Sequence, residues 1–401
     1  MRARWTIVAG VLALGAAPAA AEVAVQTPAA ALAQDAREYA GRFGVSVGEA
    51  LGRLAALEAS VAATDALAVR HAGRLAGIAV EHAPSLRIVV LLTGDAPAPD
   101  EVAPGGITIT YRTGARATRS ELVAAIRSHQ AAIRAALPRP PALAADPRTG
   151  ELVVLVNGAD AALPLADFQD EWRALTGVPV RVETMGTAVT DFVAGGARLE
   201  GVDPANGRRY ACTAGFVVTD GARTGLVTAA HCPDNLVHRD PQRVATSLPF
   251  AGQWGWGYQD VQLHLSDTAL PPHFFADSGK TATRAVASWR PRDSTRAGDF
   301  VCHRGERTGY SCATVEFVDF APAGDLCGGA CLPTWVAVAG PSCRGGDSGA
   351  PVFTGSTAFG IVKGGTYRAD GSCAFYFYMS VDYLPAGWRL LHAPSGAVAG
   401  R

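Results

Sequence analysis

The first half of the chain has the hydrophobic periodicity of an α+β region. From about residue 22 to residue 80, apolar side chains recur at helical spacing, as in Val47, Leu51, Leu54, Leu57 and Val61. Beyond residue 80, short β-branched runs alternate with longer amphipathic segments. The pattern predicts strands at 86–92, 107–111, 152–156 and 178–182, a helix at 121–137, and a helix at 166–175 that is closed by Gly177.

The pattern changes at about Thr190, where helical periodicity gives way to short apolar runs. Glycine, proline, aspartate and serine separate these runs and favour turns between them. Many short strands with frequent turn signals are typical of an antiparallel sandwich or barrel. The predicted strands include 216–218, 225–228, 314–318, 335–338 and 359–362. We therefore expect an α+β region followed by an all-β region.

The first 21 residues have the pattern of a signal peptide. Arg2 and Arg4 provide a positive start, residues 5–14 form an apolar run, and alanines at 19–21 offer a cleavage site. The apolar run is shorter than the roughly 20 residues that a bilayer span needs, and no later segment is long and apolar enough. We expect export, no membrane anchor, and a chain that starts near Glu22 after cleavage.

Composition narrows the classes of function. The formal net charge is -1 and 18% of the residues are charged, which excludes the sustained positive surface of a non-specific nucleic-acid binder. All eight cysteines lie in the second half of the chain, and an even number in one half of an exported chain indicates disulfides. Zinc is the alternative, with Cys327 and Cys331 as half of a four-cysteine site, but no second closely spaced pair completes it.

Three segments of the second half contain the side chains that activate a serine: Thr228–Cys232 with His231, Tyr258–Val261 with Asp260, and Gly345–Pro351 with Ser348. A serine hydroxyl is a weak nucleophile near neutral pH and needs an imidazole to accept its proton. A buried carboxylate then fixes the tautomer of that imidazole and stabilises its protonated form. Glycines before the serine let backbone N–H groups face a developing oxyanion. Each residue alone is more often structural, but the three together predict nucleophilic catalysis.

These motifs resemble those of the chymotrypsin-like serine proteases. The family resemblance rests on Cys212–Phe216, Thr228–Cys232 and Gly346–Pro351. Three further segments are similar to the bacterial secreted branch of streptogrisin and alpha-lytic protease, namely Val193–Gly196, Val301–Cys312 and Gly360–Gly365. The similarity covers about residues 190–385.

The resemblance implies a fold and a set of roles. Residues 191–401 would be an all-β serine endopeptidase domain of two six-stranded antiparallel Greek-key β-barrels, with the active site between them. His231 would be the general base, Asp260 its orienting carboxylate and Ser348 the nucleophile, with the N–H groups of Gly346 and Ser348 as the oxyanion hole. Residues 22–190 would be an α+β pro-domain that assists folding and is then removed.

The resemblance also implies a disulfide set and a buried charge. The family pairs would be Cys212–Cys232, Cys302–Cys312 and Cys343–Cys373, and we expect the two remaining cysteines, Cys327 and Cys331, to bond to each other. Asp347 would lie buried behind the oxyanion loop and would need a cationic partner. Arg304 is the expected partner, and the neighbouring His303 is the alternative.

The substrate pocket departs from that of trypsin-like relatives. Cleavage after basic residues requires a carboxylate at the base of the pocket, where this chain has Ser342. Gly364 and Gly365 resemble an open pocket wall and Gly345 adds no bulk, which favours a large apolar side chain at P1, the substrate residue before the cleaved bond. Lys363 stands where relatives usually carry a serine; its ammonium would pair with the catalytic carboxylate, face solvent, or bias the pocket toward acidic residues. We favour the apolar preference because a buried lysine is costly and easily neutralised.

Other classes of function fit less well. An α/β-hydrolase elbow needs glycine where this chain has Ala350, and its histidine follows the serine. The run around Lys280 lacks the leading glycine of a P-loop, and no His-Glu-x-x-His is present. An inactive homologue that only binds a partner is the main alternative, although no triad member is missing. We expect polypeptide substrates, with no cofactor or metal and no nucleic-acid or membrane partner. The pro-domain is the expected folding partner, and the enzyme is expected to be a monomer. We expect secretion, with the periplasm as a transit compartment.

Overall fold

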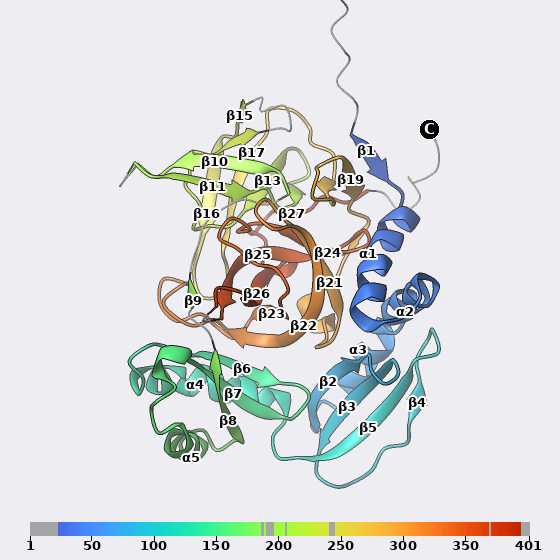
Figure 1. Cartoon of the computed structure of the whole chain (residues 1–401), viewed down its shortest axis with the longest axis vertical. Coiled ribbons are helices and arrows are strands. Elements are labelled where there is room, and N and C mark those ends of the chain that lie inside the picture. Colours follow the sequence, from blue (N-terminus) through green and yellow to red (C-terminus); the bar gives the residue numbers. More distant parts are fainter. Residues whose placement is uncertain are drawn as a thin grey trace, which may run out of the picture.

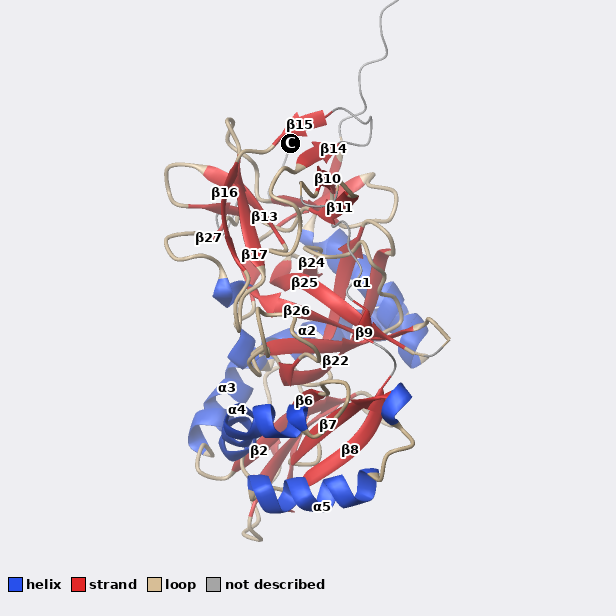
Figure 2. Ribbon diagram, turned by 90° about the vertical axis from the view of Figure 1, so that its left-hand side faces the viewer, coloured by secondary structure: helices blue, strands red, loops and turns tan. Residues whose placement is uncertain are grey.

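The computed structural model describes residues 23–185, 188–189, 196–204, 207–239, 245–368 and 370–393 (Figure 1). The predicted signal peptide at 1–21 lies outside the described residues. We call residues 23–185 the N-terminal region and residues 196–393 the C-terminal region. In both views the sheets of the N-terminal region lie below the mostly β C-terminal region (Figures 1 and 2). Within these described ranges, no helix is long and apolar enough to cross a bilayer.

Three helices open the N-terminal region: α1 (Pro28–Phe43), α2 (Val47–Ala59) and α3 (Val61–Arg70). The side chains of Thr27 and Ser46 accept hydrogen bonds from backbone N–H groups in the first turns of α1 and α2. Gly44 ends α1 with a φ of 66°, a left-handed conformation that favours glycine. The helical prediction is therefore confirmed over most of residues 28–70.

The helical prediction is wrong at residues 75–81, which form strand β2 (Leu75–Glu81). This strand pairs antiparallel with β3 (Arg87–Thr93). Gly77 lies so close to Pro147 that an added Cβ would be 2.1 Å from the Pro147 carbonyl oxygen. Pairing with β3 and this close approach determine the structure of the segment, and local periodicity contains neither.

Two small sheets complete the N-terminal region. The first has the order β2-β3-β5-β4, and the second joins β6, β7 and β8. Helix α4 starts with a capping box of Thr118 and Glu121, and α5 ends at Gly177, as predicted. The predicted helices and strands of 86–182 are confirmed, with small shifts at their ends. Their bounds are β4 (Glu101–Val102), β5 (Thr108–Ala115), α4 (Arg119–Ala135), β6 (Ala142–Asp146), β7 (Glu151–Asn157), α5 (Leu165–Thr176) and β8 (Val180–Met185).

The first half of the C-terminal region supplies a four-stranded sheet, β11-β10-β14-β15, and four strands of a five-stranded sheet, β16-β17-β13-β12-β27. The fifth strand, β27, comes from the end of the region. The predicted short strands at 216–218 and 225–228 are confirmed as β12 and β13. The bounds are β10 (Arg198–Val202), β11 (Arg209–Thr213), β12 (Val217–Thr219), β13 (Thr224–Thr228), β14 (Val237–Arg239), β15 (Ala245–Ser247), β16 (Phe250–Trp254), β17 (Val261–Leu265) and β27 (Arg389–Leu390).

The second half of the C-terminal region contains a closed six-stranded barrel. The strand order is β21-β24-β25-β26-β23-β22, and pairing of β21 with β22 closes it. Its wall packs apolar side chains inward, among them Val301, Val315, Val336 and Val352. The predicted mostly β fold with a six-stranded barrel is thus confirmed for this half. The bounds are β21 (Phe300–Gly305), β22 (Gly309–Ala321), β23 (Trp335–Ala339), β24 (Pro351–Thr354), β25 (Thr357–Tyr367) and β26 (Cys373–Ser380).

Backbone pairing joins the N-terminal region to the C-terminal region, and β9, which lies between the two, also pairs with the barrel. Strand β6 extends the barrel by pairing antiparallel with β22, for example Ala144 with Phe320. Near the N-terminus, β1 (Ala24–Gln26) pairs with β19 (Ala282–Ala285), which also pairs with β18 (His273–Phe275). The two residues of β9 (Ala188–Val189) pair antiparallel with β25, where Val189 faces Gly365. A short strand β20 (Ser288–Trp289) runs beside β25 as well.

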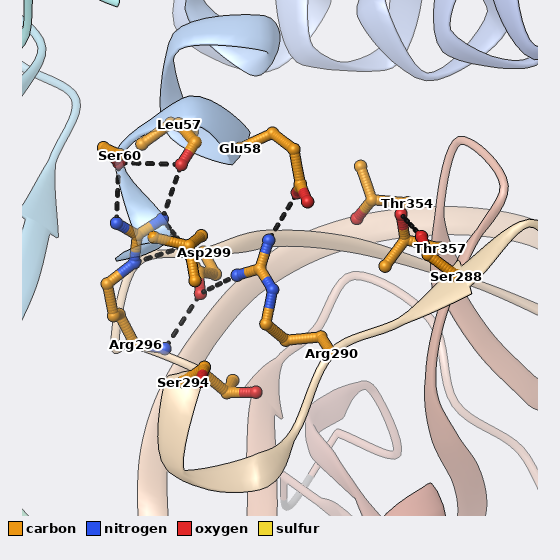
Figure 3. A network of polar contacts seen from close by, with 12 residues as sticks. Leu57, Glu58, Ser60, Ser288, Arg290, Ser294, Arg296, Asp299, Thr354 and Thr357 are labelled. Carbon is orange, nitrogen blue, oxygen red and sulfur yellow. Dashed lines mark hydrogen bonds and ion pairs between the residues drawn. The ribbon is translucent and has the colours of Figure 1, made fainter. Parts of the chain in front are cut away.

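Buried arginines of the C-terminal region reinforce this junction. Arg296 donates hydrogen bonds to Ser60 Oγ and to the Leu57 carbonyl at the end of α2, and it pairs with Asp299 (Figure 3). Arg290 forms an ion pair with Glu58 of the same helix. The N-terminal region therefore shares both strands and polar contacts with the barrel.

Candidate active site

His231 follows β13 and the buried residues Ala229 and Ala230. The disulfide between Cys212 and Cys232 ties the position next to His231 to strand β11. The imidazole is 27% exposed, so its outer edge remains accessible while its inner edge contacts buried groups. A fixed, half-buried imidazole is suited to exchange protons with a bound molecule.

Asp260 immediately precedes β17, and its carboxylate is 2% exposed. Its Oδ2 lies 2.9 Å from His231 Nδ1, and its Oδ1 accepts a hydrogen bond from the backbone N–H of His231 at 3.3 Å. Because the carboxylate can only accept, Nδ1 carries the proton and Nε2 is left as the acceptor. The backbone N–H of Asp260 in turn donates to Met379 Sδ on β26.

The pKa of Asp260 reflects two opposing effects. Burial alone raises it, but the charges of His231 and Lys363 and hydrogen bonds from both side chains outweigh burial and hold the pKa at about 2. The carboxylate is therefore ionised at neutral pH.

Ser348 lies in the loop between Arg344 and β24 and is 2% exposed. Its Oγ is 2.9 Å from His231 Nε2, the nitrogen that the contact with Asp260 leaves as an acceptor. The next position has room only for glycine, because a Cβ added to Gly349 would lie 2.3 Å from both the Thr213 carbonyl oxygen and Thr228 Oγ1. The structure thus brings the three predicted side chains into one hydrogen-bonded chain, in the order Asp260, His231, Ser348.

The loop before Ser348 leaves two backbone donors available. Gly346 has a φ of 133°, which favours glycine. Among the described residues, the N–H groups of Gly346 and Ser348 donate to no backbone or side-chain acceptor, whereas that of Asp347 bonds to Arg344 and that of Gly349 to Val362. Two available donors on one loop, at and near the nucleophile, are the arrangement that binds an oxyanion.

The predicted pairing of Asp347 with Arg304 is wrong. In the part of the chain that the structure describes, Asp347 forms no ion pair; its carboxylate accepts hydrogen bonds from three backbone N–H groups and from Thr308 Oγ1, the last at 2.8 Å. The Arg304 guanidinium instead donates to the Asp277 and Ser278 carbonyls and pairs with Glu306. Backbone donors of the hairpin between β21 and β22 thus replace the expected cation.

His303, the alternative partner, reaches Asp347 through Thr308. His303 Nε2 lies 3.1 Å from Thr308 Oγ1. Since the Thr308 hydroxyl donates to Asp347, it must accept from His303, so Nε2 carries the proton. Burial lowers the pKa of His303, although the charge of Asp347 opposes this. Sequence reasoning missed Thr308, because a threonine in a hairpin gives no signal of what packs against it.

Lys363 points away from the pocket. Its Nζ pairs with Asp260 Oδ2 at 3.3 Å and lies 5.1 Å from the centroid of the Trp335 ring. Of the alternatives considered for Lys363, the structure supports the pairing with Asp260. It offers no support for a role of the ammonium within the pocket.

A small pocket lies beside Ser348. Gly364 and Gly365 form part of its wall, and Tyr367 and Tyr376 contribute aromatic surface. Ser342 and Gly345 are not among the residues that line it. The two residues of β9 follow this same edge of β25, which shows that the edge accepts an extended chain.

All four predicted disulfides are confirmed, including the bond between Cys327 and Cys331. The same bonds bear on metal binding. Asp35 lies near Cys302 and Cys312, which would suggest a ligand cluster within the described ranges, but the two sulfurs are bonded to each other and offer no thiolate.

No family model matches the chain. Streptogrisin-D of Streptomyces griseus is 27% identical over 250 residues, which cover 61% of this chain and 59% of the relative. Streptogrisin-C of the same organism is 25% identical over 174 residues, which cover 41% of this chain and 35% of the relative. The chain thus matches less than two thirds of the length of either relative.

Among solved structures, Thermobifida fusca protease A has 25% sequence identity and a TM-score of 0.39, covering 50% of this chain and 99% of that one. The sequence relatives agree with the family indicated by the motifs around His231 and Ser348. The chain is similar to the streptogrisins over part of its length, and this similarity supports the chymotrypsin-like serine protease family.

Proposed function

We propose that the chain is the precursor of a secreted serine endopeptidase. The observation that carries this proposal is the hydrogen-bonded order of Asp260, His231 and Ser348, next to the two unused N–H donors of the Gly346 loop. The five-stranded and four-stranded sheets would form the first barrel of the family fold, opposite the closed barrel.

The proposed chemistry follows from the proton positions. Ser348 Oγ attacks the peptide carbonyl carbon while its proton passes to His231 Nε2, and Asp260 stabilises the imidazolium that forms. The N–H groups of Gly346 and Ser348 bind the oxyanion. The imidazolium then protonates the leaving amine, and an acyl group remains on Ser348. A water molecule, deprotonated by His231, hydrolyses this ester and restores the serine.

We propose that residues 22–190 act as the pro-domain and residues 191–401 as the protease domain. The pairing of β6 with β22 supports a role in folding, because it adds a preformed strand to the barrel. The pairing of β9 with β25 supports a role in keeping the precursor inactive, because it occupies an edge beside Ser348. Cleavage near residue 190 would release that edge.

For specificity, we propose a preference for large apolar P1 side chains. Glycines in the wall and the rings of Tyr367 and Tyr376 support it, and Lys363 is turned toward Asp260. Burying such a side chain contributes about 1.5 to 3 kcal/mol. A peptide library tests this. Faster cleavage after Gln or Asn would contradict it and would implicate His303 Nδ1 and Tyr376 Oη, two buried atoms that have no hydrogen-bond partner among the described residues.

The partners and compartment are part of the same proposal. Polypeptides are the substrates, the pro-domain is the folding partner, and the mature enzyme is a monomer. The four disulfides support an oxidising compartment outside the cytoplasm.

Labelling of the expressed full chain with a fluorophosphonate, followed by peptide cleavage, tests the function. The wild type should be labelled at Ser348 and should cleave peptides, and Ser348→Ala should lose both properties while keeping its thermal unfolding transition. The variant should also remain an uncleaved precursor if maturation is autocatalytic. A folded wild type from which residues 22–190 have been removed and which still escapes labelling, or cleavage by Ser348→Ala, would overturn the proposal and favour an inactive homologue.

A further inference from the structure

Lys363 brings a second cation to the triad. Its Nζ lies 3.3 Å from Asp260 Oδ2, and the two side chains are 4% and 2% exposed. The face of Trp335 covers the ammonium on another side. Both the carboxylate and the aromatic face stabilise the charged form of the lysine.

The ammonium and the imidazole share one carboxylate oxygen. Asp260 Oδ2 is also the atom that His231 Nδ1 contacts at 2.9 Å. The charges that act most strongly on Asp260 among the described residues are those of His231 and Lys363. Met379, which accepts from the Asp260 N–H, and Trp335, which covers the ammonium, carry no charge. With a neutral imidazole the carboxylate and the ammonium cancel. When the imidazole is protonated, two cations share one anion away from water.

We propose that Lys363 is a positioning residue that makes the His231 imidazole a weaker base, so that the enzyme stays active to lower pH than a triad with an uncharged residue at this position. The inference rests on the proposed function. Lys363 acts through Asp260: it holds the carboxylate by an ion pair and reduces the stabilisation that the carboxylate gives to the imidazolium. Since only the neutral imidazole accepts the serine proton, the fall of activity with acidification moves to lower pH.

The acid limb of the kcat/KM profile measures this effect. We expect the midpoint of that limb in Lys363→Ser and Lys363→Met to lie about one pH unit above that of the wild type, equivalent to a tenfold change in the imidazole protonation equilibrium. The methionine fills the space of the lysine stem, whereas the serine leaves it open. Lys363→Arg keeps the charge and should retain most of the wild-type midpoint. Lys280→Met is the matched control, since Lys280 pairs with Glu306 and does not contact Asp260.

The outcomes separate this inference from the proposed function. A wild type that neither cleaves peptides nor reacts with a phosphonate refutes the function. An active wild type whose profile overlays those of Lys363→Ser and Lys363→Met refutes the role of Lys363. If both variants fail to fold, Lys363→Gln, which keeps most of the length of the stem without its charge, takes their place: an acid midpoint about one pH unit above that of the wild type supports the inference, and a midpoint equal to it overturns it.

Discussion

At the scale of single residues, Asp260 is held on several sides, by the backbone and imidazole of His231 and by Lys363. We expect Asp260→Asn to keep the fold and to lose about ten-thousand-fold in kcat, because an amide no longer fixes the tautomer of the imidazole. Peptide hydrolysis measures the loss of kcat, and thermal unfolding measures whether the fold is kept. Asp267→Asn is the matched control, since Asp267 is exposed and follows the end of β17, whereas Asp260 precedes its start. A large loss in that variant instead would move the third triad role away from Asp260.

The residues of the candidate site differ in how far the sequence predicts them. The motifs around His231 and Ser348 identify both residues as functional, because a cysteine follows the histidine and glycines flank the serine. The environment of Asp347 cannot be predicted in this way, because most of its hydrogen bonds come from the turn between β21 and β22, and only the folded chain brings that turn to the serine loop. A formal charge in the sequence suggested Arg304, whereas backbone donors satisfy the carboxylate.

At the scale of elements, helix α1 is fixed to the C-terminal region by one buried carboxylate. Asp35 accepts two hydrogen bonds from Arg284, one from Tyr310 and one from the backbone N–H of Gly355. Both charged side chains are 0% exposed. A fully satisfied buried pair adds modest net stability, but removing one partner leaves the other charge uncompensated.

We therefore expect Asp35→Ala to lower the free energy of unfolding of the full chain by about 3 to 5 kcal/mol. Urea titration measures this with the disulfides intact, in a Ser348→Ala background that prevents self-cleavage. Glu49→Gln is the control: Glu49 on α2 pairs with Arg53 at the surface and should change stability by less than about 1 kcal/mol. A loss below 1 kcal/mol for Asp35→Ala would show that α1 is not held by this contact.

Element types were predictable wherever the residues that set the pattern are local. The strands and helices between residues 86 and 182 have period and capping signals of their own. Strand β2 was missed because its partner β3 decides its conformation. The pairing of β6 with β22 could not be predicted either, because the two strands are distant in the sequence and a hydrophobic pattern does not indicate which strand pairs with which.

At the scale of the whole molecule, His82 links the two regions through its ring. Nε2 lies 2.7 Å from the Gly298 carbonyl oxygen and Nδ1 lies 2.7 Å from the Tyr39 hydroxyl. The carbonyl only accepts, so Nε2 carries the proton and Nδ1 accepts from the tyrosine. Phe43 stacks on the ring with centroids 4.3 Å apart. A second proton on Nδ1 would oppose the tyrosine donor and place a charge in this apolar contact.

Burial lowers the pKa of His82, helped by Arg53 and Arg42 and opposed by the hydrogen bond to Gly298 and by Asp299. The unfolded chain therefore binds this proton at higher pH than the folded chain. Stability is full above about 6.5 and falls as the pH drops below that value, by up to 1.4 kcal/mol per pH unit for one proton. We expect urea titrations of the Ser348→Ala precursor between pH 7 and 5 to show this loss. Faster amide hydrogen exchange in α1 should accompany it. His82→Gln keeps a donor and an acceptor without titrating, so its stability should depend less on pH; an unchanged dependence would exclude His82 as the group that responds to acid.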